Sequence, residues 1–366
     1  MSISPIEVHP LPSRADSGDI FMCRCLELAR LGAGWVSPNP MVGAVLVHED
    51  RVIGEGYHQH FGGPHAEVLC LDAVQEADRP LIPFSTLYVS LEPCAHHGKT
   101  PPCTERIIRE GIRSVVIACR DPFPQVDGRG VEQLLSAGIE VKQGLREAEA
   151  TELNRRFFTF HTRQRPFVIL KWAESADGAI AGPDRQPVAI SGEATRRLVH
   201  RWRSEEAAIL VGAETVLQDN PRLTNRFHAG RQPVRIVLDG ELRVPFHFNV
   251  YNDEAPTLII NRKEQREEGR LHYLKVRDTR NLDEVLERIA GIGIMSILVE
   301  GGAEVLNAFM AGNYADEIRR LVSTTERIPG GYAAPEISRA IGCALEYVEE
   351  VGQDLLEYYR NKEMKT

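Results

Sequence analysis

The chain has 366 residues, of which 43% are hydrophobic and 26% charged. This is the composition of an ordinary globular protein, and the length suffices for two domains of about 100 to 200 residues each. The formal net charge of −9 argues against broad nucleic-acid binding, which relies on clustered lysines and arginines that displace counterions.

The N-terminus lacks an apolar leader segment, and no run approaches the roughly 18 apolar residues of a membrane span. The seven cysteines are an odd number spread along the chain. We therefore expect a reducing cytoplasm, no membrane or nucleic-acid partner, and a small-molecule substrate.

The first elements are a helix and a hairpin. Residues 1–16 are polar and proline-bearing, so we expect a loose arm. Apolar residues at helical spacing then predict a helix that begins near 16–17 and ends before Gly32. The apolar run 41–47 and the segment 51–56 flank a short polar turn, which predicts a β-hairpin.

The next elements carry the chemistry. A helical stretch at 67–74 follows His65, and a strand at 86–91 runs into Glu92-Pro93-Cys94. His65 thus lies at a helix start and Cys94 at a strand-to-helix turn. At such positions the backbone N–H groups and the helix dipole favour thiolates. Further elements are expected to complete an α/β/α layer: a helix at 104–110, a strand at 114–118, a helix at 131–135 and a strand at 139–141.

His65, Cys94 and Cys103 form a candidate zinc site. One imidazole and two thiols suit a catalytic Zn²⁺, whose fourth position stays open for water. Glu67 lies two residues after His65, where its carboxylate can relay a proton from that water without binding the metal. This order of histidine, glutamate, proline-cysteine and cysteine is typical of zinc-dependent nucleobase deaminases.

The alternative is that these cysteines are ordinary buried thiols and His65 a core histidine. Three donors in order, with a glutamate at the right offset, disfavour it. Eight residues separate Cys94 from Cys103, whereas the commoner motif has two, and the longer loop indicates a distinct subfamily.

A second α/β pattern follows. Residues 147–165 are charged and helical and end at Pro166, so we place the domains at 1–146 and 147–366. Strands are expected at 167–172, 207–211, 234–238, 257–260 and 296–299, with helices near 193–203, 282–289 and 304–310.

The strand at 296–299 feeds Glu300-Gly301-Gly302-Ala303, which opens a helix. Glycines there let the backbone approach a phosphate closely at the helix N-terminus. A tight turn with no ligand is at least as consistent with this pattern. Arg203 and Arg226 are likewise consistent with plain surface charges.

Several runs together resemble the bifunctional riboflavin-biosynthesis deaminase/reductase family. In the first half they are Pro40-Met41-Val42-Gly43, Gly56-Tyr57-His58, Pro64-His65-Ala66-Glu67, Leu91-Glu92-Pro93-Cys94 and Thr100-Pro101-Pro102-Cys103. In the second half they are Ser175-Ala176-Asp177-Gly178, Ile190-Ser191, Thr215, Asp219-Asn220-Pro221, Leu223-Thr224, Arg226 and Glu300-Gly301-Gly302-Ala303.

The resemblance implies a cytidine-deaminase-like three-layer α/β/α domain followed by a dihydrofolate-reductase-like α/β domain. The first would hydrolyse an amino group from 2,5-diamino-6-(5-phosphoribosylamino)pyrimidin-4-one, using one Zn²⁺ per chain. The second would reduce the ribosyl group of the deaminated product to ribityl with NADPH. A homo-oligomer is expected.

The resemblance also implies residue roles. Glu67 is the proton shuttle, and the zinc ligands are His65, Cys94 and Cys103. The cofactor-binding positions are Glu174, Ala189, Thr215, Asp219, Gly301, Gly302 and Ala303. The substrate-binding positions are Arg203, Leu223, Arg226 and Glu300. The forked donors of the two arginines suit a phosphate.

The chain departs from the family in three places. Ala189-Ile190-Ser191 stands where many relatives have Trp-Ile-Thr, so an indole that stacks on the cofactor is missing. Ala176 replaces a leucine, and the segment after Leu321 lacks the usual proline-lysine-leucine-leucine-glycine turn.

Two other functions are compatible with parts of the sequence. A tRNA or free-nucleoside deaminase with an unrelated C-terminal domain is disfavoured by the acidic charge and the long cysteine loop. A structural zinc in a binding module is disfavoured by Glu67, because a structural site needs four ligands and no proton shuttle.

Overall fold

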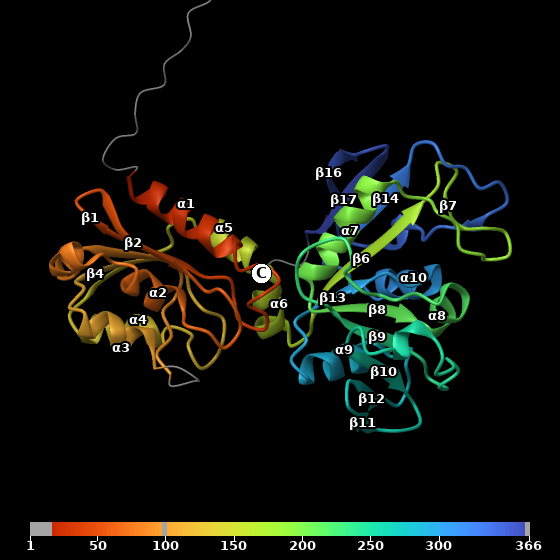
Figure 1. Ribbon diagram of the computed structural model, residues 1–366, viewed down its shortest axis with the longest axis horizontal. Coiled ribbons are helices and arrows are strands. Elements are labelled where there is room, and N and C mark those ends of the chain that lie inside the picture. Colours follow the sequence, from red (N-terminus) through yellow and green to blue (C-terminus); the bar gives the residue numbers. More distant parts are fainter. Residues whose placement is uncertain (1–16, 97–100, 363–366) are drawn as a thin grey trace, which may run out of the picture. The chain divides into compact units, whose positions relative to one another are not determined.

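The computed structural model describes residues 17–96 and 101–362 (Figure 1). The arm expected at 1–16 and residues 97–100 of the cysteine loop lie outside the described residues. By its internal contacts the chain divides into two compact units, Met1–Asn154 and Arg155–Thr366.

The first unit contains a five-stranded sheet with the order β2-β1-β3-β4-β5. Its elements are α1 (Ser17–Arg30), β1 (Gly43–His48), β2 (Arg51–Tyr57), α2 (Ala66–Asp72), the 3₁₀ helix η1 (Glu76–Phe84), β3 (Thr86–Leu91), α3 (Cys103–Arg109), β4 (Ser114–Cys119), α4 (Arg129–Ser136), β5 (Glu140–Gln143) and α5 (Glu147–Leu153). β1 pairs antiparallel with β2 and β3, and β3, β4 and β5 are parallel.

Helices cover this sheet in two groups. α2, α3 and α4 contact one another in sequence, and their apolar residues pack with alternate residues of the strands, such as Ala44, Leu46 and Val89. α1 and α5 contact each other, and they also contact β1, β3 and β4. The predicted three-layer α/β/α domain is confirmed, and each predicted element of this unit is present within a few residues.

The boundary between the units lies later than the sequence-based boundary between residues 146 and 147. The helical stretch 147–165 forms two helices, α5 and α6 (Arg155–Arg163). Between them, Asn154 accepts a hydrogen bond from the Met41 amide (2.8 Å) and donates one to the Met41 carbonyl (2.9 Å). Because these contacts hold α5 to the first unit, the chain leaves that unit after Asn154.

The second unit is built on a ten-stranded sheet with the order β11-β12-β10-β9-β8-β13-β6-β14-β17-β16. The five predicted strands are β6 (Phe167–Glu174), β8 (Ala208–Gly212), β9 (Val234–Leu238), β10 (Thr257–Asn261) and β13 (Ser296–Val299), and the predicted helices are α7 (Glu193–Glu205), α9 (Leu282–Gly291) and α10 (Ala303–Ala311). The α/β fold expected of this unit is confirmed.

The sequence analysis did not predict the other elements of the second unit. They are β7 (Ala179–Ala181), α8 (Ala213–Asp219), η2 (Asn249–Tyr251), β11 (Arg266–Glu268), β12 (Leu271–Lys275), β14 (Glu317–Ser323), β15 (Tyr332–Ala333), η3 (Ile337–Arg339), β16 (Cys343–Val351) and β17 (Asp354–Asn361). The atypical segment after Leu321 does not interrupt the sheet, since β14 pairs with β17 from Glu317 to Ser323.

Both faces of the central strands are buried, as is usual for parallel strands. Val168, Leu170 and Trp172 of β6 belong to a core that includes α9 and α10. Phe167 and Ile169 belong to the opposite core, which includes α7 and α8.

The parallel strands β6, β8 and β13 end at the same edge of the sheet. Val299 of β13 is level with Leu170 of β6 and Leu210 of β8. Residues that follow these strands therefore lie together at the carboxyl edge, which is where open α/β sheets usually bind ligands. Among the described residues, none of the helices combines the length and apolar character needed to span a bilayer.

Candidate active sites

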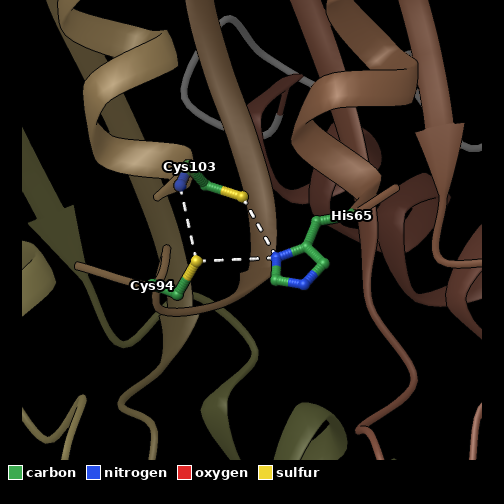
Figure 2. A group of neighbouring side chains, drawn as sticks. All are labelled: His65, Cys94 and Cys103. Atoms are coloured by element: carbon green, nitrogen blue, oxygen red, sulfur yellow. Dashed lines mark hydrogen bonds between the residues drawn. The ribbon is translucent and has the colours of Figure 1, made fainter. Parts of the chain in front are cut away.

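His65, Cys94 and Cys103 converge in the first unit (Figure 2). The Nδ1 atom of His65 lies 3.5 Å from the Cys94 sulfur and 3.3 Å from the Cys103 sulfur. All three ligand atoms are within 4.8 Å of one another, and Cys103 is fully buried. The structure thus brings together the three residues that the sequence proposes as ligands.

Local structure explains the convergence. His65 precedes the first residue of α2, and Cys103 is the first residue of α3. The backbone N–H of Cys103 donates to the Cys94 sulfur at 3.4 Å. A hydrogen bond from the Cys103 side chain, and then His65, lower the pKa of Cys94, whereas the pKa of Cys103 is raised, so Cys94 ionises before Cys103.

The donor set fits zinc. One imidazole nitrogen and two sulfurs are ligands of the borderline-soft type that Zn²⁺ prefers, and three protein ligands leave one position for water. Among the described residues, this is the one group of histidine, cysteine and acidic side chains close enough to hold a metal.

Glu67 lies in the first turn of α2, interacts with His65, Cys94 and Cys103, and is 3% exposed. Burial raises the pKa of its carboxyl above the ordinary value. A carboxyl group with a raised pKa takes up a proton more readily than an ordinary carboxylate, which favours proton exchange with a water molecule beside it.

Asn39 and His58 adjoin the metal-ligand group, and sequence reasoning assigned them no role. The ring of His58 meets that of His65 edge-on with centroids 5.5 Å apart. His58 Nδ1 lies 2.9 Å from the Pro64 carbonyl, and its Nε2 lies 2.9 Å from the Asn39 amide nitrogen. His58 belongs to one of the runs that carried the family resemblance, and Asn39 directly precedes another, but nothing in their local spacing pointed to the metal.

The loop that carries Cys94 is anchored on α4. The buried Glu92 carboxylate accepts hydrogen bonds from the backbone N–H groups of Asp121 (3.3 Å), Gly128 (3.0 Å) and Val131 (3.1 Å). A Cβ atom on Gly130 would lie 2.1 Å from the Pro93 carbonyl oxygen, so this contact requires glycine.

In the second unit, Glu300 and two cations meet at the carboxyl edge of the sheet. The guanidinium of Arg203 donates two hydrogen bonds to Glu300, at 2.8 and 2.7 Å. The ammonium of Lys171, which sequence reasoning left without a role, lies 3.9 Å from the same carboxylate. Burial alone would raise the pKa of Glu300, but Arg203 and Lys171 outweigh it and lower that pKa to about 2.

The glycine turn after β13 packs closely on β8. A Cβ atom on Gly301 would lie 2.5 Å from the Val211 Cα, so no residue with a side chain fits at this position. The amide of Gly302 donates to the Thr215 hydroxyl at 2.8 Å. Ala303 then begins α10, whose first N–H groups are available to an anion.

The remaining predicted positions are more scattered. The carboxylate of Glu174, at the end of β6, accepts hydrogen bonds from Trp172 Nε1 (2.7 Å) and Arg320 Nη2 (2.5 Å). Ala189 and Asp219 are exposed, and among the described residues no hydrogen bond joins the Asp219 carboxylate to another predicted position.

Leu223 and Arg226 belong to the segment between α8 and β9. Leu223 is buried and has a positive φ of 51°. The Arg226 side chain is exposed and lies over the Phe227 ring, 5.7 Å from its centroid. The backbone of this segment contacts α7, because Arg203 Nη1 donates to the Thr224 carbonyl at 3.1 Å.

Comparisons with known proteins agree with this geometry. The family model of the cytidine and deoxycytidylate deaminase zinc-binding region matches residues 17–119, and that of the RibD C-terminal domain matches residues 166–326. The riboflavin biosynthesis protein RibD of Aquifex aeolicus is 41% identical over 352 residues, which cover 93% of this chain and 97% of the relative.

Two solved structures resemble the whole chain. The diaminohydroxyphosphoribosylaminopyrimidine deaminase/5-amino-6-(5-phosphoribosylamino)uracil reductase of Thermotoga maritima has a TM-score of 0.86 and 37% identity, covering 95% of this chain and 100% of that one. RibD of Acinetobacter baumannii has a TM-score of 0.86 and 31% identity, covering 95% of this chain and 99% of that one.

Proposed function

The chain belongs to the RibD family of bifunctional riboflavin-biosynthesis deaminase/reductases, and from this premise we propose the substrates, cofactors and residue roles of its two units. The first unit hydrolyses the amino group of 2,5-diamino-6-(5-phosphoribosylamino)pyrimidin-4-one, giving 5-amino-6-(5-phosphoribosylamino)uracil and ammonia. The second unit reduces the ribosyl group of that product to ribityl with NADPH.

In the deaminase unit, His65, Cys94 and Cys103 would hold one Zn²⁺ per chain. A zinc ion bound there would supply a water with a pKa near neutrality. Glu67 would accept a proton from the attacking water and donate it to the departing amino group, so that the water oxygen adds to the ring carbon and ammonia leaves. The observation that carries this assignment is the buried Glu67 carboxyl beside three converging ligands.

In the reductase unit, the turn at Gly301, Gly302 and Ala303 would bind the phosphates of NADPH together with Thr215. The close packing of Gly301 on β8 supports this role, as does Gly302 at the N-cap of α10, which has no side chain to cap the first N–H groups. Asp219 and Ala189 would contact the cofactor from neighbouring segments. Because Ala189 lacks an indole, cofactor stacking there is weaker than with tryptophan.

Glu174 requires a different explanation from the other cofactor positions. Its carboxylate already accepts hydrogen bonds from Trp172 and Arg320. We therefore assign its contribution to the backbone at the end of β6, with the side chain serving to fix that strand end.

Arg203, Leu223, Arg226 and Glu300 would bind the reductase substrate. Arg226 is exposed and has no ion-pair partner among the described residues, whereas Arg203 is engaged by Glu300. A free guanidinium beside a second cation is suited to a phosphate, because its forked donors match the phosphate oxygens.

A coupled assay tests the proposal. The purified protein, given the diaminopyrimidine phosphate and NADPH, is expected to release ammonia and to oxidise NADPH afterwards. A panel of cytidine, adenosine and tRNA tests the alternative of a nucleoside or tRNA deaminase; ammonia release from any of these, with none from the diaminopyrimidine, would refute the proposal. A homo-oligomer and a cytoplasmic location stay predictions.

A further inference from the structure

His200 connects α7 to the segment that carries Arg226. It lies three residues before Arg203 on α7, so the two side chains share a face of the helix. His200 is 4% exposed, and its Nδ1 accepts a hydrogen bond from the backbone N–H of Arg226 at 2.9 Å. Nothing in the activity described above uses this residue.

The Arg226 segment has a second attachment to the same helix. Arg203 donates to the Thr224 carbonyl at 3.1 Å, two residues before the amide that His200 holds. Leu223, with its positive φ of 51°, precedes both contacts. Two side chains of α7 therefore set the backbone path of residues 224–226.

His200 is a neutral acceptor in a cationic environment. Burial, followed by the charges of Arg203 and Arg226, lowers the pKa of His200 to about 4. At physiological pH its Nδ1 is unprotonated, as the bond from Arg226 requires, and the ring proton is on Nε2.

The Arg226 guanidinium has no anionic partner to orient it. Lys171 and Arg203 already share Glu300, and among the described residues Arg226 forms no ion pair. Its direction is therefore set by its backbone and by the Phe227 ring. The ring of His200 also meets that of Phe227, with centroids 4.6 Å apart.

We propose that His200 is a positioning residue of the reductase site: its Nδ1 holds the Arg226 backbone so that the Arg226 guanidinium meets the substrate phosphate. This inference rests on the proposed role of Arg226 in substrate binding. His200 acts through Arg226 and has no contact of its own with the reacting atoms.

Two substitutions separate this role from a general packing role. In His200→Asn the amide oxygen takes the place of Nδ1, whereas in His200→Gln it takes the place of Nε2. We expect His200→Asn to keep the KM for the deaminated substrate within about threefold. His200→Gln should raise that KM about tenfold, the effect of one lost hydrogen bond, with little change in kcat. His247→Gln, at an exposed histidine, is the matched control.

Substrate lacking the phosphate gives an independent measurement. We expect His200→Gln and wild type to reduce the dephosphorylated substrate with equal KM. With the phosphorylated substrate, adding His200→Gln to Arg226→Ala should raise the KM no further than Arg226→Ala alone. Nitrogen-15 NMR of histidine-labelled wild type should show an unprotonated Nδ1 at His200, a result that does not depend on either variant folding.

Three outcomes would overturn the inference while leaving the reductase function intact: equal KM values for His200→Asn and His200→Gln, equal losses by His200→Gln with and without the phosphate, or a protonated Nδ1. Absence of NADPH oxidation by wild type would instead overturn the proposed function on which the inference rests.

Discussion

Replacing Glu92 by glutamine tests whether a buried carboxylate outside the metal-ligand group holds that group together. Oε2 of Glu92 accepts from the backbone N–H groups of Asp121 and Gly128, and Oε1 accepts from that of Val131. Glutamine has a single oxygen, so at most two of these three contacts survive. Its NH₂ group then faces the remaining N–H donor.

The expected loss of stability follows from these contacts. A hydrogen bond to a charged group contributes about 1.5 to 3 kcal/mol, and an unsatisfied buried donor costs about 1 to 3 kcal/mol. Glu92 is 4% exposed, so water does not replace the lost partner. We expect Glu92→Gln to lower the free energy of unfolding of the first unit by about 2 to 4 kcal/mol.

Zinc binding should weaken as well. Glu92 fixes the end of β3 two residues before Cys94. The same loop is also held to α4 by the Thr104 hydroxyl, which lies 3.2 Å from the Cys94 carbonyl and 2.6 Å from Gln133 Oε1. Loss of a group that hydrogen-bonds to a metal ligand typically reduces metal affinity by about ten- to a hundredfold. Because Glu92 does not touch a ligand, we expect the lower end of this range.

The assay is urea unfolding with and without zinc, together with competition for zinc against a chromophoric chelator. Glu132→Gln is the control, since Glu132 is an exposed glutamate in the first turn of the same helix, and it should change stability by less than about 0.5 kcal/mol. Equal stability and equal zinc affinity of Glu92→Gln and wild type would refute the reasoning.

Three further predictions concern the two proposed sites. Glu67→Gln should keep zinc and the fold but abolish ammonia release, and the variant should still reduce the deaminated intermediate when this compound is supplied. Retained ammonia release would show that Glu67 is not the proton shuttle. Asp219→Ala and Arg226→Ala should each leave ammonia release near normal and lower NADPH oxidation by about ten- to a hundredfold; equal loss of both activities at an unchanged melting temperature would contradict separate sites. The pKa of His200 is lowered to about 4 in the folded chain, from about 6.5 in the unfolded chain. Between about pH 4 and 6.5, His200 therefore binds a proton in the unfolded chain but not in the folded chain. Stability of the second unit should therefore fall by about 1 to 3 kcal/mol as pH drops from 6.5 to 4, and less in His200→Asn; identical pH profiles from urea unfolding would contradict this.

The sequence by itself determined the metal-ligand group and most of the central elements. His65 and Glu67 are neighbours on one helix start, and Cys94 follows a strand that alternating and apolar residues identify. Donor type and local spacing are properties of short segments, so they can be inferred without tertiary contacts. The parallel strands β6, β8 and β13 were likewise identified, because fully buried strands are continuous apolar runs.

Only the tertiary structure decided the contacts between distant segments. Lys171 meets Glu300 because β6 and β13 are neighbours in the sheet, and His200 meets the Arg226 backbone because α7 packs beside that segment. Glu174 is engaged by Arg320 of the adjacent strand β14. Strand order and helix packing set these distances, and they depend on summed burial over whole faces of the sheet, which no local pattern of residues encodes.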